Sequence, residues 1–424
     1  MFRRCIAYVV DIRENEATAL KWSWLYSFAL LLCYYILRPI RDDLGVNGGV
    51  HNLPWLFTGT LITMILLNPV FGYLVKRWPR EKFVAIAYRF FALNLVIFSL
   101  ALVFSTATER VWVGRVFFIW VSVFNLFVVS VFWSLVDDVF SSEQGKRLFG
   151  FLAAGATLGG VVGALVTSVI VELVGQSWML ILSAILLEFG VFAARKLLRN
   201  APRFVDKDDV SDEMIKGGSI ISGLVNTFKS PYLLGIAGFI LFYSVTSTFL
   251  YFQQGSVAQS DFHNNGARTV FFAHIDLWVN IITFILQMGI TGRLTRWLGV
   301  ALIISILPLV SILGFGSLLF WPSVVALILV QVVRRVSNFA FARPTREILF
   351  TVIPREDRYK AKNFIDTVIY RSGDQIGSWS YVGLSATGMG ATGMVVVAIP
   401  LSAIWLLLSV WLGWRHHRIE HFAE

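Results

Sequence analysis

The sequence is poor in cysteine and in charge, and both shortages narrow the class of protein. Only Cys5 and Cys33 occur among 424 residues, which excludes a disulfide framework and a cysteine metal site. Charged residues make up 15% of the chain, whereas about a quarter is usual for a soluble globular protein. The hydrophobic share is 57%, and it falls in long blocks. These features predict a membrane protein built from spanning helices.

Motifs of catalysis are lacking as well. The sequence has no P-loop, no H-E-x-x-H, no paired nucleophile and base, and no sizeable soluble domain. We therefore expect neither an enzyme nor an ATP-driven pump, and no cofactor or bound metal. The net charge of +10 could indicate nucleic-acid binding, but the basic residues lie in loops between apolar runs. Membrane topology explains that placement better, so we expect the lipid bilayer as partner and no nucleic acid.

Apolar blocks predict an all-α polytopic membrane protein with 12 transmembrane helices in two six-helix bundles. The blocks cover residues 22–37, 53–75, 83–106, 111–139, 148–173, 177–198, 232–252, 270–290, 298–320, 324–351, 362–385 and 394–414. The corresponding domains are a cytoplasmic leader (1–21), an N-terminal bundle (22–198), a cytoplasmic connection (199–230), a C-terminal bundle (231–414) and a cytoplasmic tail (415–424). The apolar run 5–10 in the leader is too short for a cleavable signal peptide.

Charge asymmetry predicts the orientation of these helices. With an even helix number both termini share one side, which carries 25 Lys and Arg residues against 3 on the other. Such a bias places the termini and the connection in the cytoplasm, and we expect a bacterial inner membrane.

The two halves repeat each other. Gly72 and the basic loop after it match Gly292 and its loop, 220 residues later. The pair Gly155 and Gly159 matches a second pair, Gly373 and Gly377, 218 residues later. Parallel six-helix repeats with a long connection resemble the plan of the major facilitator superfamily, and the loop 72–82 resembles its loop between helices two and three. That resemblance implies a substrate site at mid-membrane between the halves.

Further stretches resemble the ATP/ADP translocases of plastids and intracellular bacteria, a divergent branch of that superfamily. They are residues 34–46 at the end of the first block, 132–133 with 146–149, 345–347, and 360–366. The resemblance implies a relative of nucleotide carriers, and we expect a monomer. It departs from the family at two positions, where Val121 replaces an acid and Asp374 replaces a lysine. We therefore expect a translocase-like protein whose substrate need not be ATP or ADP.

Charged residues inside or beside the apolar blocks are the candidate site, because charge at bilayer depth is kept mainly where it faces a polar cavity or another charge. The expected substrate-binding residues are Arg38, Arg41, Arg343, Arg346 and Arg371. The expected ion-pairing or proton-coupling residues are Asp42, Glu347, Asp366, Asp374 and Asp276. Helical spacing places Arg343 with Glu347 and Arg371 with Asp374, either as a substrate pathway or as ion pairs that hold helices together. Arg89 is expected to snorkel, and Glu188 is a candidate proton relay.

Three functions remain open on the sequence. The first is a secondary transporter that moves a small anionic metabolite by alternating access. The second, with the same fold, is a proton-coupled importer or exporter of a neutral or cationic solute that uses Asp366, Asp374 and Asp276. The third is a membrane enzyme or receptor. Competition by phosphates or carboxylates would indicate the first function. A response to a pH gradient would indicate the second, and turnover without a sealed membrane the third.

Overall fold

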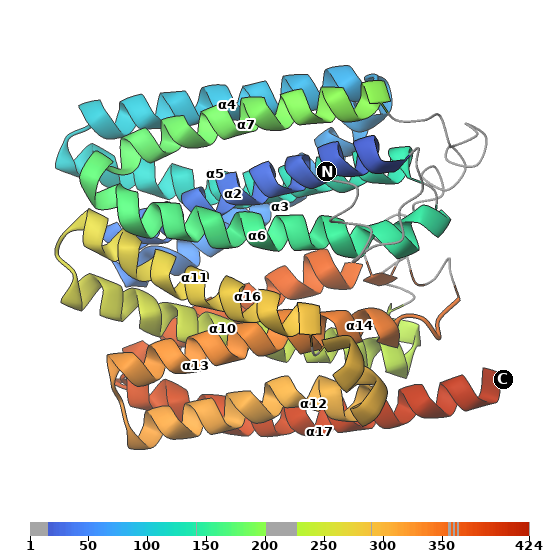
Figure 1. The fold of residues 1–424 in the computed structure, drawn as a ribbon. Helices are drawn as coiled ribbons and strands as arrows, with labels where there is room; N and C mark the ends of the chain where they lie inside the picture. The colour runs from blue at the N-terminus through green and yellow to red at the C-terminus, as the bar shows by residue number, and fades with distance from the viewer. Residues whose placement is uncertain are drawn as a thin grey trace. The chain divides into compact units, whose positions relative to one another are not determined.

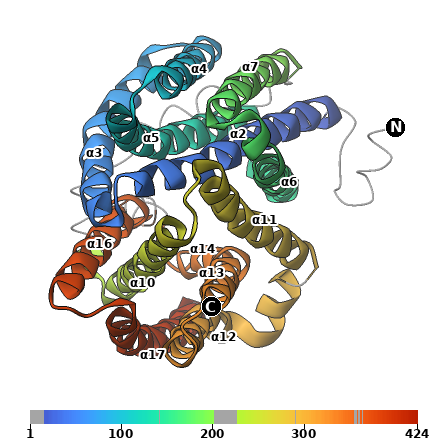
Figure 2. The ribbon, with the colours of Figure 1, turned by 90° about the vertical axis from the view of Figure 1, so that its left-hand side faces the viewer.

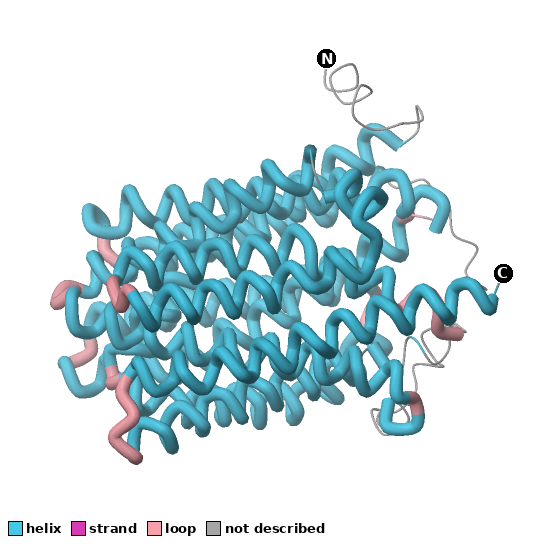
Figure 3. Tube along the Cα trace, turned by 90° about the horizontal axis from the view of Figure 1, so that it is seen from below, coloured by secondary structure: helices cyan, strands magenta, loops and turns pink. Residues whose placement is uncertain are grey.

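The computed structural model describes residues 16–140, 142–200, 227–289, 291–354, 358, 361–362 and 364–423. Every regular element within those ranges is helical, and short loops join the helices (Figure 3). The predicted leader and cytoplasmic connection fall mostly on residues 1–15 and 201–226, which lie outside the described ranges.

Within the described ranges, six long helices form the first half of the chain (Figure 1). They are α2 (Ala17–Asn47), α3 (Leu53–Arg77), α4 (Arg80–Phe104), α5 (Ala107–Val139), α6 (Ser142–Val174) and α7 (Gln176–Asn200), with a short 3-10 turn, η2 (Val50–Asn52), before α3. The second half holds α10 (Pro231–Asp261), α11 (Asn265–Gly289), α12 (Thr291–Phe320), α13 (Val324–Ser337), η3 (Asn338–Ala342), α14 (Arg343–Leu349), η4 (Ile365–Ile369), α16 (Tyr370–Ala386) and α17 (Ala391–Ala423).

Eleven stretches of these helices are long and apolar enough to cross a membrane. The predicted span 362–385 is absent from that set, and its described helix is rich in serine, glycine and charged residues. Most of the span is nevertheless helical, since η4 and α16 form one run from Ile365 to Ala386. The expected all-α fold with membrane-spanning helices is confirmed.

The first helix is longer than its apolar block. The apolar block ends at residue 37, but α2 continues through the charged run Arg38 to Asp43 and ends at Asn47. The charges remain helical because each finds a partner: Arg38 pairs with Asp276, Arg41 with Asp42, and Asp43 with an arginine of α11.

The chain separates into two compact units. Unit 1 comprises Met1–Gly49, Thr58–Ile215 and Asp261–Asn280, and unit 2 comprises Val50–Phe57, Lys216–Ser260 and Ile281–Glu424. Both α3 and α11 therefore contribute residues to each unit. In unit 1, α2 packs against α5, α6 and α7, and α4 packs against α5 and α7 (Figure 2). In unit 2, α12 packs against α13, α14 and α17.

The repeated glycines make the same kind of contact in both units. A Cβ atom built on Gly159 would lie 2.3 Å from the carbonyl oxygen of Phe28, so α6 touches α2 through bare backbone. A Cβ atom on Gly373 would lie 2.6 Å from Cβ of Ser244, so α16 approaches α10 in the same way. Glycines four apart permit such close helix packing in membranes. The fifth span of each half thus packs on the first through equivalent glycines.

Two π-helical turns flank the charged residues of unit 2. The turn η3 ends where Arg343 begins α14, and η4 contains Asp366 and leads into Arg371. Pro344 explains η3, because proline has no N–H to donate to the preceding turn and the helix must change register. Such π turns occur frequently at functional sites. A third interruption is Gly299 in α12, whose φ of 73° suits glycine and divides that helix.

Candidate functional site

Unit 1 places its predicted arginines on one helix. Arg38 and Arg41 lie on α2, one turn apart. Arg38 Nη1 is 3.1 Å from Asp276 Oδ1, and the exposed fractions of the two side chains are 19% and 3%. Asp276 comes from α11, whose Asn280 donates a hydrogen bond to the Asp276 carbonyl. The structure therefore brings together two predicted residues that are 238 positions apart in the sequence.

Arg41 pairs with the residue next to it. Its Nε and Nη2 donate to Asp42 Oδ1 over 2.9 Å and 2.5 Å, and its guanidinium lies 5.0 Å from the Phe118 ring centre. Neighbouring residues on a helix do not normally face each other, so helical spacing did not predict this pair. Arg41 keeps an exposed fraction of 15%, whereas Asp42 keeps 5%.

A buried network beyond this pair was missed by sequence reasoning. Arg268 Nε donates to Asp43 Oδ1 over 2.6 Å, and Gln176 Nε2 donates to Asp43 Oδ2 over the same distance. Gln176 also donates to Thr269, and it accepts a hydrogen bond from Arg110. Asp43 lies next to Asp42, which was chosen as the site residue, and Arg268 lies in the expected loop between the blocks 232–252 and 270–290. Neither was therefore predicted as a site residue. The network ties the end of α2 to the starts of α7 and α11.

In unit 2 the predicted charged residues also form ion pairs, but the partners are not always those expected from helical spacing. Arg371 Nη1 is 3.2 Å from Asp374 Oδ2, as the spacing of three predicts. Ser244 donates its hydroxyl to Asp374 Oδ1 over 2.5 Å and also contacts the carbonyl of Tyr370. Thr248 lies 3.5 Å from the same carboxylate oxygen. Asp374 therefore joins α16 to α10 at the level where Gly373 lets them touch.

The expected pair between Arg343 and Glu347 is wrong. Glu347 Oε2 instead contacts Lys362 Nζ over 2.5 Å, and Arg343 is exposed and forms no ion pair with any described residue. Arg346 Nη2 lies 3.0 Å from Asp366 Oδ1, a pairing that joins α14 to η4. Arg343 and Glu347 both lie in α14, so the helical spacing itself is kept; the pair is absent because Glu347 contacts Lys362 instead.

Arg334 is another buried charge that was not among the predicted site residues. Its side chain is fully buried in unit 2, where Nε donates to Ser311 over 2.8 Å and Nη1 to Ser247 over 3.0 Å. Its Nη2 donates to Thr246 and to the carbonyl of Tyr243. Hydroxyl and carbonyl oxygens thus hold this cation, and the described part of the chain supplies no carboxylate to it.

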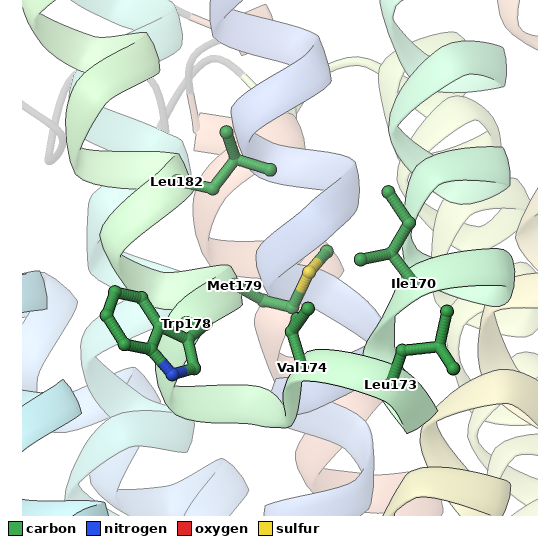
Figure 4. Close-up of a pocket in the computed structure, with 6 residues that line it drawn as sticks. All are labelled: Ile170, Leu173, Val174, Trp178, Met179 and Leu182. Carbon is green, nitrogen blue, oxygen red and sulfur yellow. The ribbon is translucent and has the colours of Figure 1, made fainter.

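Two apolar cavities lie apart from these charges. One, of about 480 Å³, lies between α6 and α7 of unit 1, where Ile170, Leu173, Trp178 and Met179 are among the lining residues (Figure 4). The other, of about 500 Å³, lies in unit 2 among α10, α16 and α17. Neither contains a predicted charged residue, so the candidate site is defined by the ion pairs.

The fold agrees with comparisons to known proteins. The family model of the Major Facilitator Superfamily matches residues 23–358. The chain belongs to that superfamily. It is accordingly an integral membrane transporter, and the resemblance inferred from the sequence is confirmed.

Two relatives at low sequence identity match nearly the full length of the chain. The chain is 22% identical to ADP,ATP carrier protein 2 of Chlamydia pneumoniae, over 98% of this chain and 92% of the relative. It is 21% identical to ADP,ATP carrier protein 1 of Chlamydia trachomatis, over 97% and 90% of the two.

Solved structures share the fold at 12% identity. One is a bacterial homologue of the human lysosomal transporter Spinster, with a TM-score of 0.61 over 96% of this chain and 99% of that one. Another is a POT family transporter in complex with 5-aminolevulinic acid, with a TM-score of 0.63 over 94% and 96% of the two chains.

Proposed function

We propose that this protein is a secondary active transporter that moves a small anionic metabolite across the membrane by alternating access. Arg38 and Arg41 of unit 1 bind the anion, as do Arg343, Arg346 and Arg371 of unit 2. The transport itself makes or breaks no covalent bond, so the proposal includes no catalytic step.

The observation that supports this proposal is that four of these arginines are ion-paired and yet partly exposed. Each lies in a helix long and apolar enough to span, or in the charged run at η4 and α16, and each is paired with a carboxylate. Their side chains nevertheless keep exposed fractions between 14% and 27%. An ion pair that served only to hold two helices together would be buried on all sides. Partial exposure leaves a face of the guanidinium open to a competing anion.

The presence of arginine rather than lysine at these positions favours the binding of an anionic group. The guanidinium fork binds carboxylate and phosphate oxygens through two parallel hydrogen bonds, which lysine cannot do. In the structure the carboxylates contact these guanidinium groups, and the anionic group of the substrate would displace them. Arg343, which has no carboxylate partner among the described residues, is the residue available to the first encounter.

Nucleotides are the first substrates to test, because the distant relatives are named ADP,ATP carriers. The local charge argues for a smaller anion. Among the charged side chains at α14, Lys362, η4 and α16 four are cationic and three are anionic, which leaves one net positive charge. They are Arg343, Arg346, Lys362 and Arg371 against Glu347, Asp366 and Asp374. Val121, where the translocases carry an acid, is fully buried in the apolar core.

A proton-coupled transporter of a neutral or cationic solute is the alternative. It is supported by the Asp374 carboxylate, which is 7% exposed and held by a serine hydroxyl as well as by Arg371. A buried carboxylate of this kind is a candidate proton carrier in a membrane helix. Transport driven by a pH gradient, with no competition by anions, would favour this alternative.

The proposed setting is a bacterial inner membrane, with two six-helix halves and both termini in the cytoplasm. The support is the asymmetry of 25 basic residues against 3. Fusing reporters that are active on only one side of the membrane to residue 424 and to the loop after α4 tests it. Activity of both fusions on the same side would contradict the orientation.

The decisive experiment is counterflow in proteoliposomes. Purified protein is reconstituted, the vesicles are loaded with one unlabelled compound, and uptake of labelled nucleotides, phosphates and organic anions is measured. We expect accumulation of at least one small anion, and competition by related phosphates or carboxylates. Counterflow of neutral or cationic compounds alone would contradict the proposal.

A further inference from the structure

An ion pair lies on the outer side of unit 1, away from the candidate site. Arg89 Nε of α4 is 3.1 Å from Glu188 Oε1 of α7, and two more contacts of 3.4 Å join the same groups. The two helices run side by side in both views (Figures 1 and 2). Their side chains are 53% and 47% exposed. The sequence suggested a snorkelling arginine and a proton relay; the structure joins these residues to each other.

The pair lies at membrane depth. Both helices belong to the stretches long and apolar enough to span, Glu81–Phe104 and Gln176–Asn200. Glu188 is the thirteenth of the 25 residues of α7, so about 18 Å of helix extends on either side of it. Half of the hydrocarbon core is about 15 Å thick. The basic residues Arg195 and Lys196 begin seven positions after Glu188, about 10 Å along the helix, so the carboxylate lies within the hydrocarbon core, between its middle and the basic end of α7.

The surface around the pair is apolar and exposed. On α4 the exposed side chains follow a spacing of four and three residues, and α7 continues the same face. They are Ile86, Phe90, Leu93, Ile97 and Leu100 on α4, and Ile185, Phe189 and Phe192 on α7. Lipid would solvate these apolar groups well, but it cannot hydrogen-bond the half-exposed guanidinium and carboxylate between them. Protein that covered this face would supply the missing partners.

The charges favour a second copy of this chain as the covering partner. The face carries a cation on one helix and an anion on the next, so a two-fold axis can bring Arg89 of one copy near Glu188 of the other and the reverse. Interhelical hydrogen bonds and close packing, rather than hydrophobicity, drive association within a bilayer. A foreign helix would need its own matching pair at the same depth.

We propose that the face formed by α4 and α7 is a homodimer interface, in which Arg89 and Glu188 of each copy form a four-charge cluster across the two-fold axis. This dimer replaces the monomer expected from the sequence. The dimer does not depend on the substrate, so its test needs no transport assay.

The test is the oligomeric state of the purified full chain in lipid vesicles, measured by single-molecule photobleaching over a range of protein-to-lipid ratios. We expect dimers for the natural sequence. The neutral variant R89Q/E188Q keeps the shapes and removes the charges, so its dimerisation should weaken about tenfold. L302A, at an exposed position of α12 in unit 2, is the matched control and should leave dimerisation unchanged. Thermal stability of each variant shows that it is folded.

Charge reversal adds a test of the contact itself. Arg89→Glu and Glu188→Arg each place two like charges in one copy, so each alone should form fewer homodimers. When the two variants carry different tags and are produced together, the opposite charges should favour mixed dimers, and capture of one tag should recover the other. Monomers at every lipid ratio would overturn the proposal. Dimers that are indifferent to R89Q/E188Q, or reversal variants that do not prefer each other, would also overturn it.

Discussion

Arg268 and Asp43 form a buried ion pair, with Nε and Oδ1 2.6 Å apart and side chains that are 8% and 0% exposed. Breaking a buried pair leaves the remaining charge without compensation, which typically costs about 3–5 kcal/mol. We therefore expect Asp43→Asn to lower the thermal stability of the detergent-solubilised protein strongly.

The exposed pair between Lys362 and Glu347 is the control for that experiment. Its side chains are 37% and 49% exposed, so Glu347→Gln should cost less than about 1 kcal/mol. Equal losses of stability for Asp43→Asn and Glu347→Gln would show that burial does not determine the contribution of these pairs.

Gly373 and Gly383 on α16 give a second matched comparison. A Cβ atom on Gly373 meets Ser244 at 2.6 Å, whereas one on Gly383 meets nothing within 4 Å. Gly373→Ala should force α16 away from α10 and cost about 1–3 kcal/mol. Gly383→Ala should gain up to about 1 kcal/mol from lower chain entropy. Thermal denaturation of both variants measures the difference, and a stable Gly373→Ala protein would contradict the packing.

Much of the fold could be predicted from the sequence, because spanning helices follow from apolar length and the repeat follows from equally spaced glycines. The candidate site could be predicted only in part. Residue types at membrane depth identified Arg38, Asp276 and Asp374, but partners that lie far apart in sequence could not be assigned. Helical spacing predicted the Arg371 pair, and it failed for Arg343 because Glu347 pairs with Lys362, a partner 15 residues further along the chain.

Replacing Arg334 even by lysine should destabilise the protein. Four hydrogen bonds join its guanidinium to Ser311 of α12 and to Tyr243, Thr246 and Ser247 of α10, and an ammonium group cannot reproduce that geometry. Arg334→Lys should therefore lose at least two of these bonds, or about 3–6 kcal/mol, since bonds to charged groups contribute about 1.5–3 kcal/mol each. Folded yield and thermal stability check this; a variant as stable as the natural protein would contradict it.

Asp374→Asn tests whether the carboxylate competes with the substrate for Arg371. The amide keeps the shape and the contact with Ser244 but removes the charge that holds the guanidinium. Expression should be unchanged, and the KM for the anionic substrate should fall about tenfold, which corresponds to ~1.4 kcal/mol. A higher KM, or loss of all pH-gradient-driven transport with no change in anion competition, would instead favour proton coupling.

The most direct test of the anion pathway is uptake in proteoliposomes by Arg346→Gln and Arg371→Gln, expressed per folded molecule. Lys196→Gln, at the end of α7 and outside the candidate site, is the control. We expect both arginine variants to insert and fold, and to lose uptake to the level of empty vesicles, while the control transports normally. Normal uptake per folded molecule by both arginine variants would contradict the proposed pathway and reduce these ion pairs to contacts that hold helices together.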